Sequence, residues 1–136
     1  MKDSVAAGAK LEAGGTFDGP FYKPTVLTGV KPGMRAFDEE IFGPVASLQT
    51  FKSEDEVIAR ANHTEYGLVA YLYTKDLSRG LRVSEKLDFG MIGLNRGIVS
   101  DPAAPFGGMK QSGLGREGGH EGLMEFLETQ YVSVTW

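Results

Sequence analysis

Residues 53–95 read SEDEVIARANHTEYGLVAYLYTKDLSRGLRVSEKLDFGMIGLN, a stretch in which helical and strand patterns alternate. At its start Ser53 is followed three residues later by Glu56, and this pair is the capping box that begins many helices. Apolar residues then recur at helical spacing, so the pattern predicts a helix over residues 54–62.

Two strand patterns and a second helix follow in the same stretch. Residues 68–73 are mostly apolar and of strand length, and residues 91–95 form a second short apolar run. Between them Asp76 is placed to cap a helix that ends near residues 88–90. Because capped helices separate the strands, the sequence predicts an α/β fold with a largely parallel sheet flanked by helices.

The N-terminal part gives weaker signals. Residues 4–11 resemble the end of a short helix, closed by the glycines of Ala13-Gly14-Gly15. Residues 24–28 and 45–51 are β-friendly runs and are expected to be strands. A chain that starts with the end of a helix is expected to be part of a longer protein.

The C-terminal part begins with a long loop at residues 96–118, which glycine and proline interrupt repeatedly. Residues 120–129 have helical spacing, and residues 131–136 alternate like a strand. We therefore expect one body over residues 1–129 and a terminal strand over residues 130–136. Ligands of open α/β sheets lie beyond the carboxyl ends of the strands, so residues that follow a strand are candidates for a site.

Composition excludes several classes of function. The chain has 136 residues, a formal net charge of -4 and no apolar run as long as a membrane span needs. Lys and Arg are scattered, so neither a nucleic acid nor a membrane is expected as a partner. The chain has no cysteine, which excludes disulfides, thiolate catalysis and cysteine metal sites. No secretory signal is found, and the expected location is the cytoplasm.

Two familiar kinds of site are present only in part. Residues 113–118 read GLGREG, which is a literal GxGxxG, but neither a preceding strand nor room for a second βαβ strand accompanies it. These glycines are better interpreted as helix-entry or close-packing residues. His63 and His120 lack metal-ligand spacing, so no metal site is predicted.

The acidic string EEIFGP at residues 39–44 allows two interpretations. Its carboxylates could form a solvated turn. Alternatively, one of them accepts hydrogen bonds from the hydroxyl groups of a ligand, and Phe42 offers a flat apolar surface to a ring. Ser100 precedes Asp101-Pro102, and this local sequence by itself predicts that Ser100 is a turn residue.

These strings together resemble a known family. From about residue 8 to residue 136, the chain is similar to the C-terminal part of the NAD(P)-dependent aldehyde dehydrogenases. The similarity is carried by EEIFGP (39–44), GLNRGIVSDPAAPFGG (93–108) and SGLGREG (112–118). Within that family these strings resemble those of bacterial succinate-semialdehyde dehydrogenases.

The resemblance implies an oxidoreductase that converts succinate semialdehyde to succinate through a cysteine thioester, with NAD or NADP as cofactor. The nucleophilic cysteine and the cofactor fold are not found in this chain. We therefore expect the chain to be inactive alone and not to hold the cofactor by itself.

The resemblance also suggests site residues. By similarity, Glu40 hydrogen-bonds the nicotinamide ribose and Phe42 packs near the nicotinamide. Ser100 is the choice for holding the substrate carboxylate, and Phe106 resembles an aromatic that lines the aldehyde pocket. No residue of this chain is assigned a catalytic role.

The terminal strand resembles one through which subunits of the family join, so a homo-oligomer is expected. The alternative hypothesis is a non-catalytic interaction module, derived from an aldehyde dehydrogenase, that associates through this strand.

Overall fold

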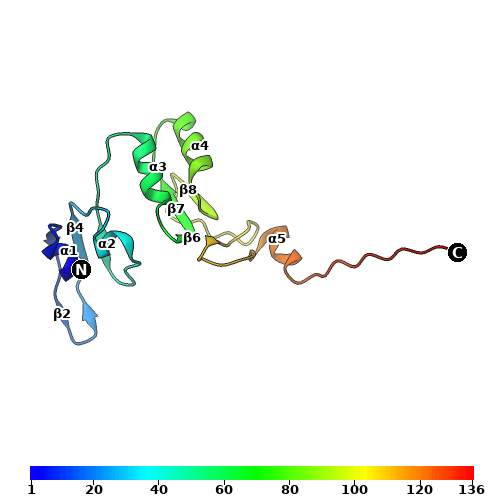
Figure 1. Ribbon diagram of the computed structural model, residues 1–136, viewed down its shortest axis with the longest axis horizontal. Coiled ribbons are helices and arrows are strands. Elements are labelled where there is room, and N and C mark those ends of the chain that lie inside the picture. Colours follow the sequence, from blue (N-terminus) through cyan, green and yellow to red (C-terminus); the bar gives the residue numbers. More distant parts are fainter. The chain divides into compact units, whose positions relative to one another are not determined.

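Helices and short sheets are interleaved along the chain, as the computed structural model of residues 1–136 shows (Figure 1). The chain divides into two units, Met1–Lys52 and Ser53–Trp136, and each unit has its own helices and strands. This arrangement confirms the α/β class. None of the helices is long and apolar enough to cross a membrane.

The first unit is built around strand β4 (Thr25–Thr28). Strand β4 pairs with β1 on one side in antiparallel fashion and with β5 on the other side in parallel fashion. Leu27 of β4 is fully buried and lies in a core with Ala9, Val30, Met34 and Ala36. The other elements of this unit are α1 (Lys2–Ala6), β1 (Lys10–Ala13), β2 (Phe17–Asp18), β3 (Phe21–Tyr22), α2 (Arg35–Asp38) and β5 (Val45–Ser47).

The prediction for the N-terminus was wrong in part. A helix is present, but it ends at Ala6, and the last two residues of the expected helix, Lys10 and Leu11, belong to strand β1 (Lys10–Ala13) instead. Leu11 pairs with Leu27 of β4, so a long-range pairing overrides the local helical preference. The expected strand over residues 45–51 is confirmed only over Val45–Ser47.

The second unit contains the capped helices. Helix α3 (Glu54–Asn62) begins where predicted, and the Ser53 hydroxyl accepts a hydrogen bond from the Glu56 amide at 3.2 Å. Helix α4 (Leu77–Lys86) is capped by Asp76, whose side chain accepts from the Arg79 amide at 3.1 Å. The strands are β6 (Tyr66–Gly67), β7 (Val69–Leu72), β8 (Met91–Leu94) and β9 (Met109–Lys110), and a last helix is α5 (Gly119–Met124).

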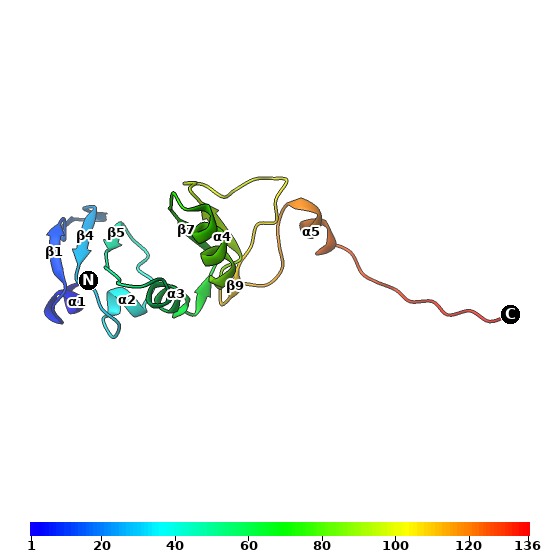
Figure 2. The ribbon, with the colours of Figure 1, turned by 90° about the horizontal axis from the view of Figure 1, so that it is seen from above.

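Strands β7 and β8 pair in parallel, and α4 packs against β8 and α3 (Figures 1 and 2). Strand β6 pairs with β9 in antiparallel fashion. Of the five strand pairings only two, β4 with β5 and β7 with β8, are parallel. A largely parallel sheet is therefore not confirmed, because the strands form separate sheets of two or three strands.

The C-terminal expectations are met only in part. Helix α5 ends at Met124 rather than at residue 129, and the amides of Phe126 and Leu127 bond three residues back in tight turns. Residues 131–136 form no strand in this single chain, and their side chains are exposed (Figure 1, red). A strand needs a neighbour for its backbone hydrogen bonds, and none pairs with this segment here.

Candidate functional site

In the first unit, the segment of residues 39–44 has an exposed side chain on either side of the half-buried Ile41. Ile41 is half-buried and packs against the core around Leu27. Glu40 before it is exposed, and Phe42 after it is 97% exposed. No ion pair of the structure includes Glu40. The segment thus leaves a carboxylate and an aromatic ring exposed on the surface of the first unit.

A charged cluster precedes this segment. The Arg35 guanidinium donates to Glu39 at 2.8 and 2.9 Å and to Asp3 at 2.7 Å. The hydrogen bond from Arg35 lowers the pKa of the Glu39 carboxyl below its ordinary value, and the same guanidinium lowers the pKa of Asp3. The two carboxylates raise the pKa of Arg35 in return. All three groups are therefore charged at neutral pH.

In the second unit, Asn95 fixes the start of the loop of residues 96–118. It follows β8 directly and adopts a φ of 53°, a left-handed conformation that Asn tolerates better than most residues. Its side-chain oxygen accepts from the Thr74 amide at 2.9 Å, and its side-chain nitrogen donates to the Thr74 carbonyl at 2.8 Å. The Asn95 side chain thus links the end of β8 to the residues that follow β7.

Asn95→Ala is expected to lower the free energy of unfolding of the second unit by about 1–2 kcal/mol, because it removes both hydrogen bonds and leaves alanine at a positive φ. Asn95→Gly also removes the two hydrogen bonds, but glycine adopts a positive φ without strain. Its free energy of unfolding should therefore fall by less than that of Asn95→Ala. Urea unfolding of the two variants measures the difference. Equal stability of both variants and the wild type would contradict the role of Asn95.

The rest of the loop is closed by hydrogen bonds between its two ends. Phe106 and Glu117 exchange backbone hydrogen bonds, both 2.7 Å long, as an isolated antiparallel bridge. The Ser112 hydroxyl accepts from the Gly67 amide at 2.9 Å and ties the loop to β6. The loop predicted from the sequence is present, and it also contains the short strand β9.

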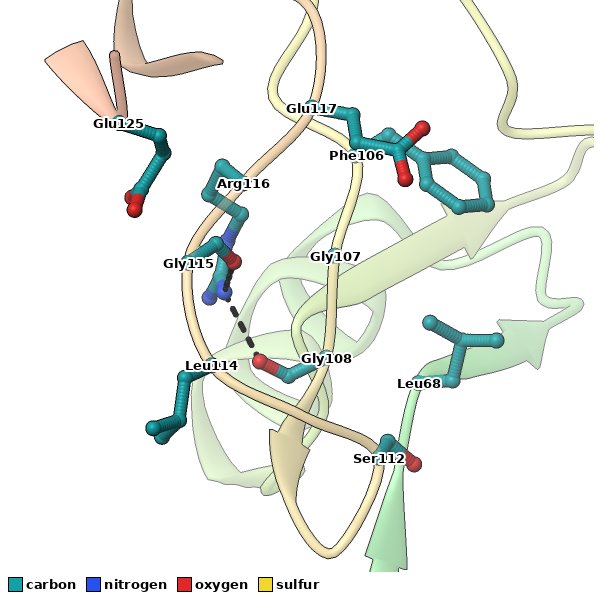
Figure 3. A pocket seen from close by; sticks show the side chains of 10 residues that line it. All are labelled: Leu68, Phe106, Gly107, Gly108, Ser112, Leu114, Gly115, Arg116, Glu117 and Glu125. Atoms are coloured by element: carbon teal, nitrogen blue, oxygen red, sulfur yellow. Dashed lines mark hydrogen bonds between the residues drawn. The ribbon is translucent and has the colours of Figure 1, made fainter.

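These contacts border an open cavity of about 340 Å³ within the second unit (Figure 3). The Arg116 guanidinium donates to the carbonyls of Gly108 and Gly115 at 2.8 and 2.7 Å. It thereby holds the two sides of the loop together. Leu68 and Phe106 add apolar surface to the cavity, and Glu117 and Glu125 add carboxylates. The other lining residues are Gly107, Gly108, Ser112, Leu114, Gly115 and Arg116.

The predicted site residues lie in different units. Glu40 and Phe42 belong to the first unit, and Ser100 and Phe106 belong to the second. Phe106 lines the cavity, whereas Ser100 is exposed and is not among the lining residues. Ser100 precedes a turn in which the Asp101 carboxylate accepts from the Ala103 amide at 2.9 Å.

Several cavity residues were not predicted as site residues. Ser112, Arg116 and Glu117 belong to the SGLGREG string, in which only the glycines give a local structural signal. Leu68 lies far before that string in sequence and Glu125 lies just after α5, and no local pattern marks either residue.

The interpretation of the GxGxxG glycines as helix-entry or close-packing residues is confirmed for Gly118. Gly118 is the N-cap residue of α5 with a φ of 65°, and a Cβ there would lie 2.9 Å from the Ala104 carbonyl oxygen. Its glycine is needed for helix entry and for close packing, as expected.

Comparison with known proteins shows which protein family this chain belongs to. The sequence model of the family described as "Aldehyde dehydrogenase family" matches residues 1–132 of this chain. The chain belongs to the aldehyde dehydrogenase family. A succinate-semialdehyde dehydrogenase from Paenarthrobacter nicotinovorans is 54% identical over 134 residues, which cover 96% of this chain and 30% of that enzyme.

Other aldehyde dehydrogenases are similar to nearly the same extent. A 3-sulfolactaldehyde dehydrogenase from Pseudomonas putida is 50% identical over 97% of this chain and 28% of its own length. The crystal structure of an aldehyde dehydrogenase from Brucella melitensis biovar abortus 2308 superposes with a TM-score of 0.91 at 54% identity, over 96% of this chain and 27% of that chain. The chain thus spans less than a third of the length of these relatives.

Proposed function

We propose that the chain is the C-terminal part of an NAD(P)-dependent succinate-semialdehyde dehydrogenase. The observation that carries this proposal is the 54% identity with the Paenarthrobacter enzyme of that name. Within such an enzyme the chain supplies contacts to the cofactor and to the substrate, whereas the covalent step belongs to residues elsewhere in the enzyme. The division into a body of residues 1–129 and a terminal strand of residues 130–136 is part of the proposal.

Glu40 and Phe42 are the proposed cofactor contacts. A carboxylate can accept hydrogen bonds from the two neighbouring hydroxyl groups of a ribose, and an exposed aromatic ring can pack beside a flat heterocycle. Both side chains are exposed and Ile41 anchors the segment between them, so the residues present fit a nicotinamide riboside group. When bound, NAD or NADP supplies the hydride acceptor.

Ser100 and Phe106 are the proposed substrate contacts. The Ser100 hydroxyl can donate a hydrogen bond to the carboxylate of a semialdehyde. Phe106 lines the cavity of the second unit and offers apolar surface to the aliphatic part of such a substrate. Together they distinguish a short chain with a carboxylate end from a purely apolar aldehyde.

The purified chain is expected to produce no reduced nicotinamide from succinate semialdehyde with NAD or NADP, because it has no cysteine that could form the thioester. A chimera in which the chain replaces the matching C-terminal part of the Paenarthrobacter enzyme is expected to be active. Absorbance of the reduced nicotinamide measures both reactions. A folded but inactive chimera, or an active isolated chain, would overturn the proposal.

The same chimera tests the substrate. We expect succinate semialdehyde to have a higher kcat/KM than 3-sulfolactaldehyde, the substrate named for the Pseudomonas relative. Ser100→Ala should raise the KM for the semialdehyde more than it changes kcat, since it removes a binding contact. The matched control is Ser78→Ala, an exposed serine on α4.

We further propose that the enzyme is a homo-oligomer that pairs through residues 131–136. This segment leaves Tyr131, Val132, Val134 and Trp136 at least two-thirds exposed, so it offers apolar surface and free backbone groups to a partner strand. The alternative of a non-catalytic module is not favoured, because the relatives named above are dehydrogenases.

A further inference from the structure

We propose that Arg35 is a positioning residue that gives two neighbouring carboxylates different tasks: it holds Glu39 in an ion pair and leaves Glu40 presented to a ligand. The part of this inference that concerns the ribose of a cofactor rests on the proposed function. The contacts of Arg35 themselves are features of the first unit alone.

All three guanidinium nitrogens of Arg35 are occupied. The Nε atom donates to both Glu39 oxygens, at 2.8 and 2.9 Å, and Nη2 lies 2.8 Å from Glu39 Oε2. The Nη1 atom donates to Asp3 Oδ2 at 2.7 Å. A planar fork is needed for this arrangement, and a lysine ammonium cannot reproduce it. Each guanidinium nitrogen thus contacts Asp3 or Glu39, and no contact of Arg35 is with Glu40.

Helix α1 is held against α2 by a second contact, which keeps Asp3 within reach of Arg35. The Ser4 hydroxyl is fully buried and accepts from the Ala36 amide at 2.9 Å. Ser4 and Asp3 are adjacent on α1, and Ala36 and Arg35 are adjacent on α2. The guanidinium is therefore placed from two helices at once.

Glu39 is fixed at its backbone as well as at its side chain. Its amide donates to the Arg35 carbonyl at 3.0 Å, and its own φ of -110° and ψ of 146° end the helix in an extended conformation. Two residues later Ile41 packs against the core. Glu40 thus lies between two anchored residues and is the carboxylate of the pair that remains available.

The role of Arg35 is geometric rather than a large contribution to stability. The side chains of Arg35, Asp3 and Glu39 are 62%, 63% and 54% exposed. Ion pairs at such exposure contribute little and are screened by salt. Their effect is instead to hold Glu39 in place, so that Glu40 is the carboxylate that remains available to bind a ligand.

The test uses the 136-residue chain and three variants, with NMR detection of glutamate carboxyls and backbone amides. In Arg35→Met we expect the Glu39 carboxyl to titrate at a higher pH than in the wild type, and the amides of Glu40, Phe42 and Gly43 to shift. Arg35→Lys should restore part of both signals. The control is Arg82→Met, which breaks a similar two-point contact with Glu54 in the other unit and should leave these amides unchanged.

The charged groups that act on Glu39 set the sign of the titration. Arg35 lowers the pKa of Glu39, Asp3 raises it, and the α-amino group of Met1 lowers it. Because the pKa of Glu39 is lowered in the folded chain, the ion pair is complete above the ordinary value and is lost as the pH falls through the folded value. Unchanged Glu39 titration and unchanged amides in Arg35→Met would overturn the proposal.

The chimera described above separates this inference from the proposed function. There Arg35→Met is expected to raise the KM for the cofactor roughly threefold to tenfold with a smaller change in kcat, because the loss is one of binding geometry. An active chimera that is indifferent to Arg35→Met would contradict the positioning role and leave the dehydrogenase assignment intact. An inactive wild-type chimera would count against the assignment, while the NMR result still decides the role of Arg35.

Discussion

Leu27→Ala is expected to lower the free energy of unfolding of the first unit by about 2–5 kcal/mol. Leu27 has no exposed surface and lies at the centre of a core that β4 shares with Val30 and Met34. The unit has only 52 residues, so few other apolar contacts can compensate for the cavity that alanine would leave.

Hydrogen exchange measured along the chain is the appropriate assay for this variant, because the two units can open separately and a single melting curve would combine them. We expect faster exchange of the amides in β1, β4 and β5. Leu48→Ala, at a leucine that is 51% exposed in the same unit, should change exchange little. Equal effects of the two substitutions would show that Leu27 is not the centre of the core.

Gly90→Ala is expected to have the second large effect, and it should act on the cavity. A Cβ at Gly90 would lie 2.0 Å from the Gly107 carbonyl oxygen and 2.9 Å from the Gly108 Cα. Gly90 itself is held by a 2.9 Å hydrogen bond from its amide to the Gly67 carbonyl. Because only backbone atoms meet, the loop must move, at a cost of about 1–3 kcal/mol.

The displacement should be visible in the NMR spectrum of the chain as shifts of the Phe106, Gly107 and Gly108 amides, with faster exchange across the second unit. Gly97→Ala is the matched control in this unit, since the nearest atom to its Cβ is the Tyr73 hydroxyl oxygen at 3.9 Å. If Gly90→Ala leaves both the amide chemical shifts and the exchange rates as in the wild type, the close approach of Gly90 to the backbone of Gly107 and Gly108 is wrong.

Local signals predicted the helices that carry their own caps. Ser53 with Glu56 and Asp76 with Arg79 make hydrogen bonds over three residues, so the start of α3 and of α4 could be predicted without knowing the rest of the fold. Strand β1 could not be predicted in this way, because its conformation depends on pairing with β4, more than ten residues away.

The candidate site shows the same division between local and distant information. A string such as EEIFGP indicates that an acid and an aromatic ring matter, but it does not say which of Glu39 and Glu40 is committed to an ion pair. Glu39 is set apart by its ion pair with Arg35 four residues earlier, and the second partner of Arg35, Asp3, lies 32 positions away in the sequence. The participation of Leu68 and Glu125 in the cavity depends in the same way on how the loop folds back.

The contact between Arg35 and Glu39 spans four positions, which is about one turn of helix. One residue fewer between them would bring Glu40 to the place that Glu39 now holds, and one residue more would turn both acids away from the guanidinium. Insertions and deletions in this turn should therefore be selected against more strongly than substitutions. Across homologous genes, the number of codons between the arginine and the acidic pair should vary less than the amino acids that those codons specify.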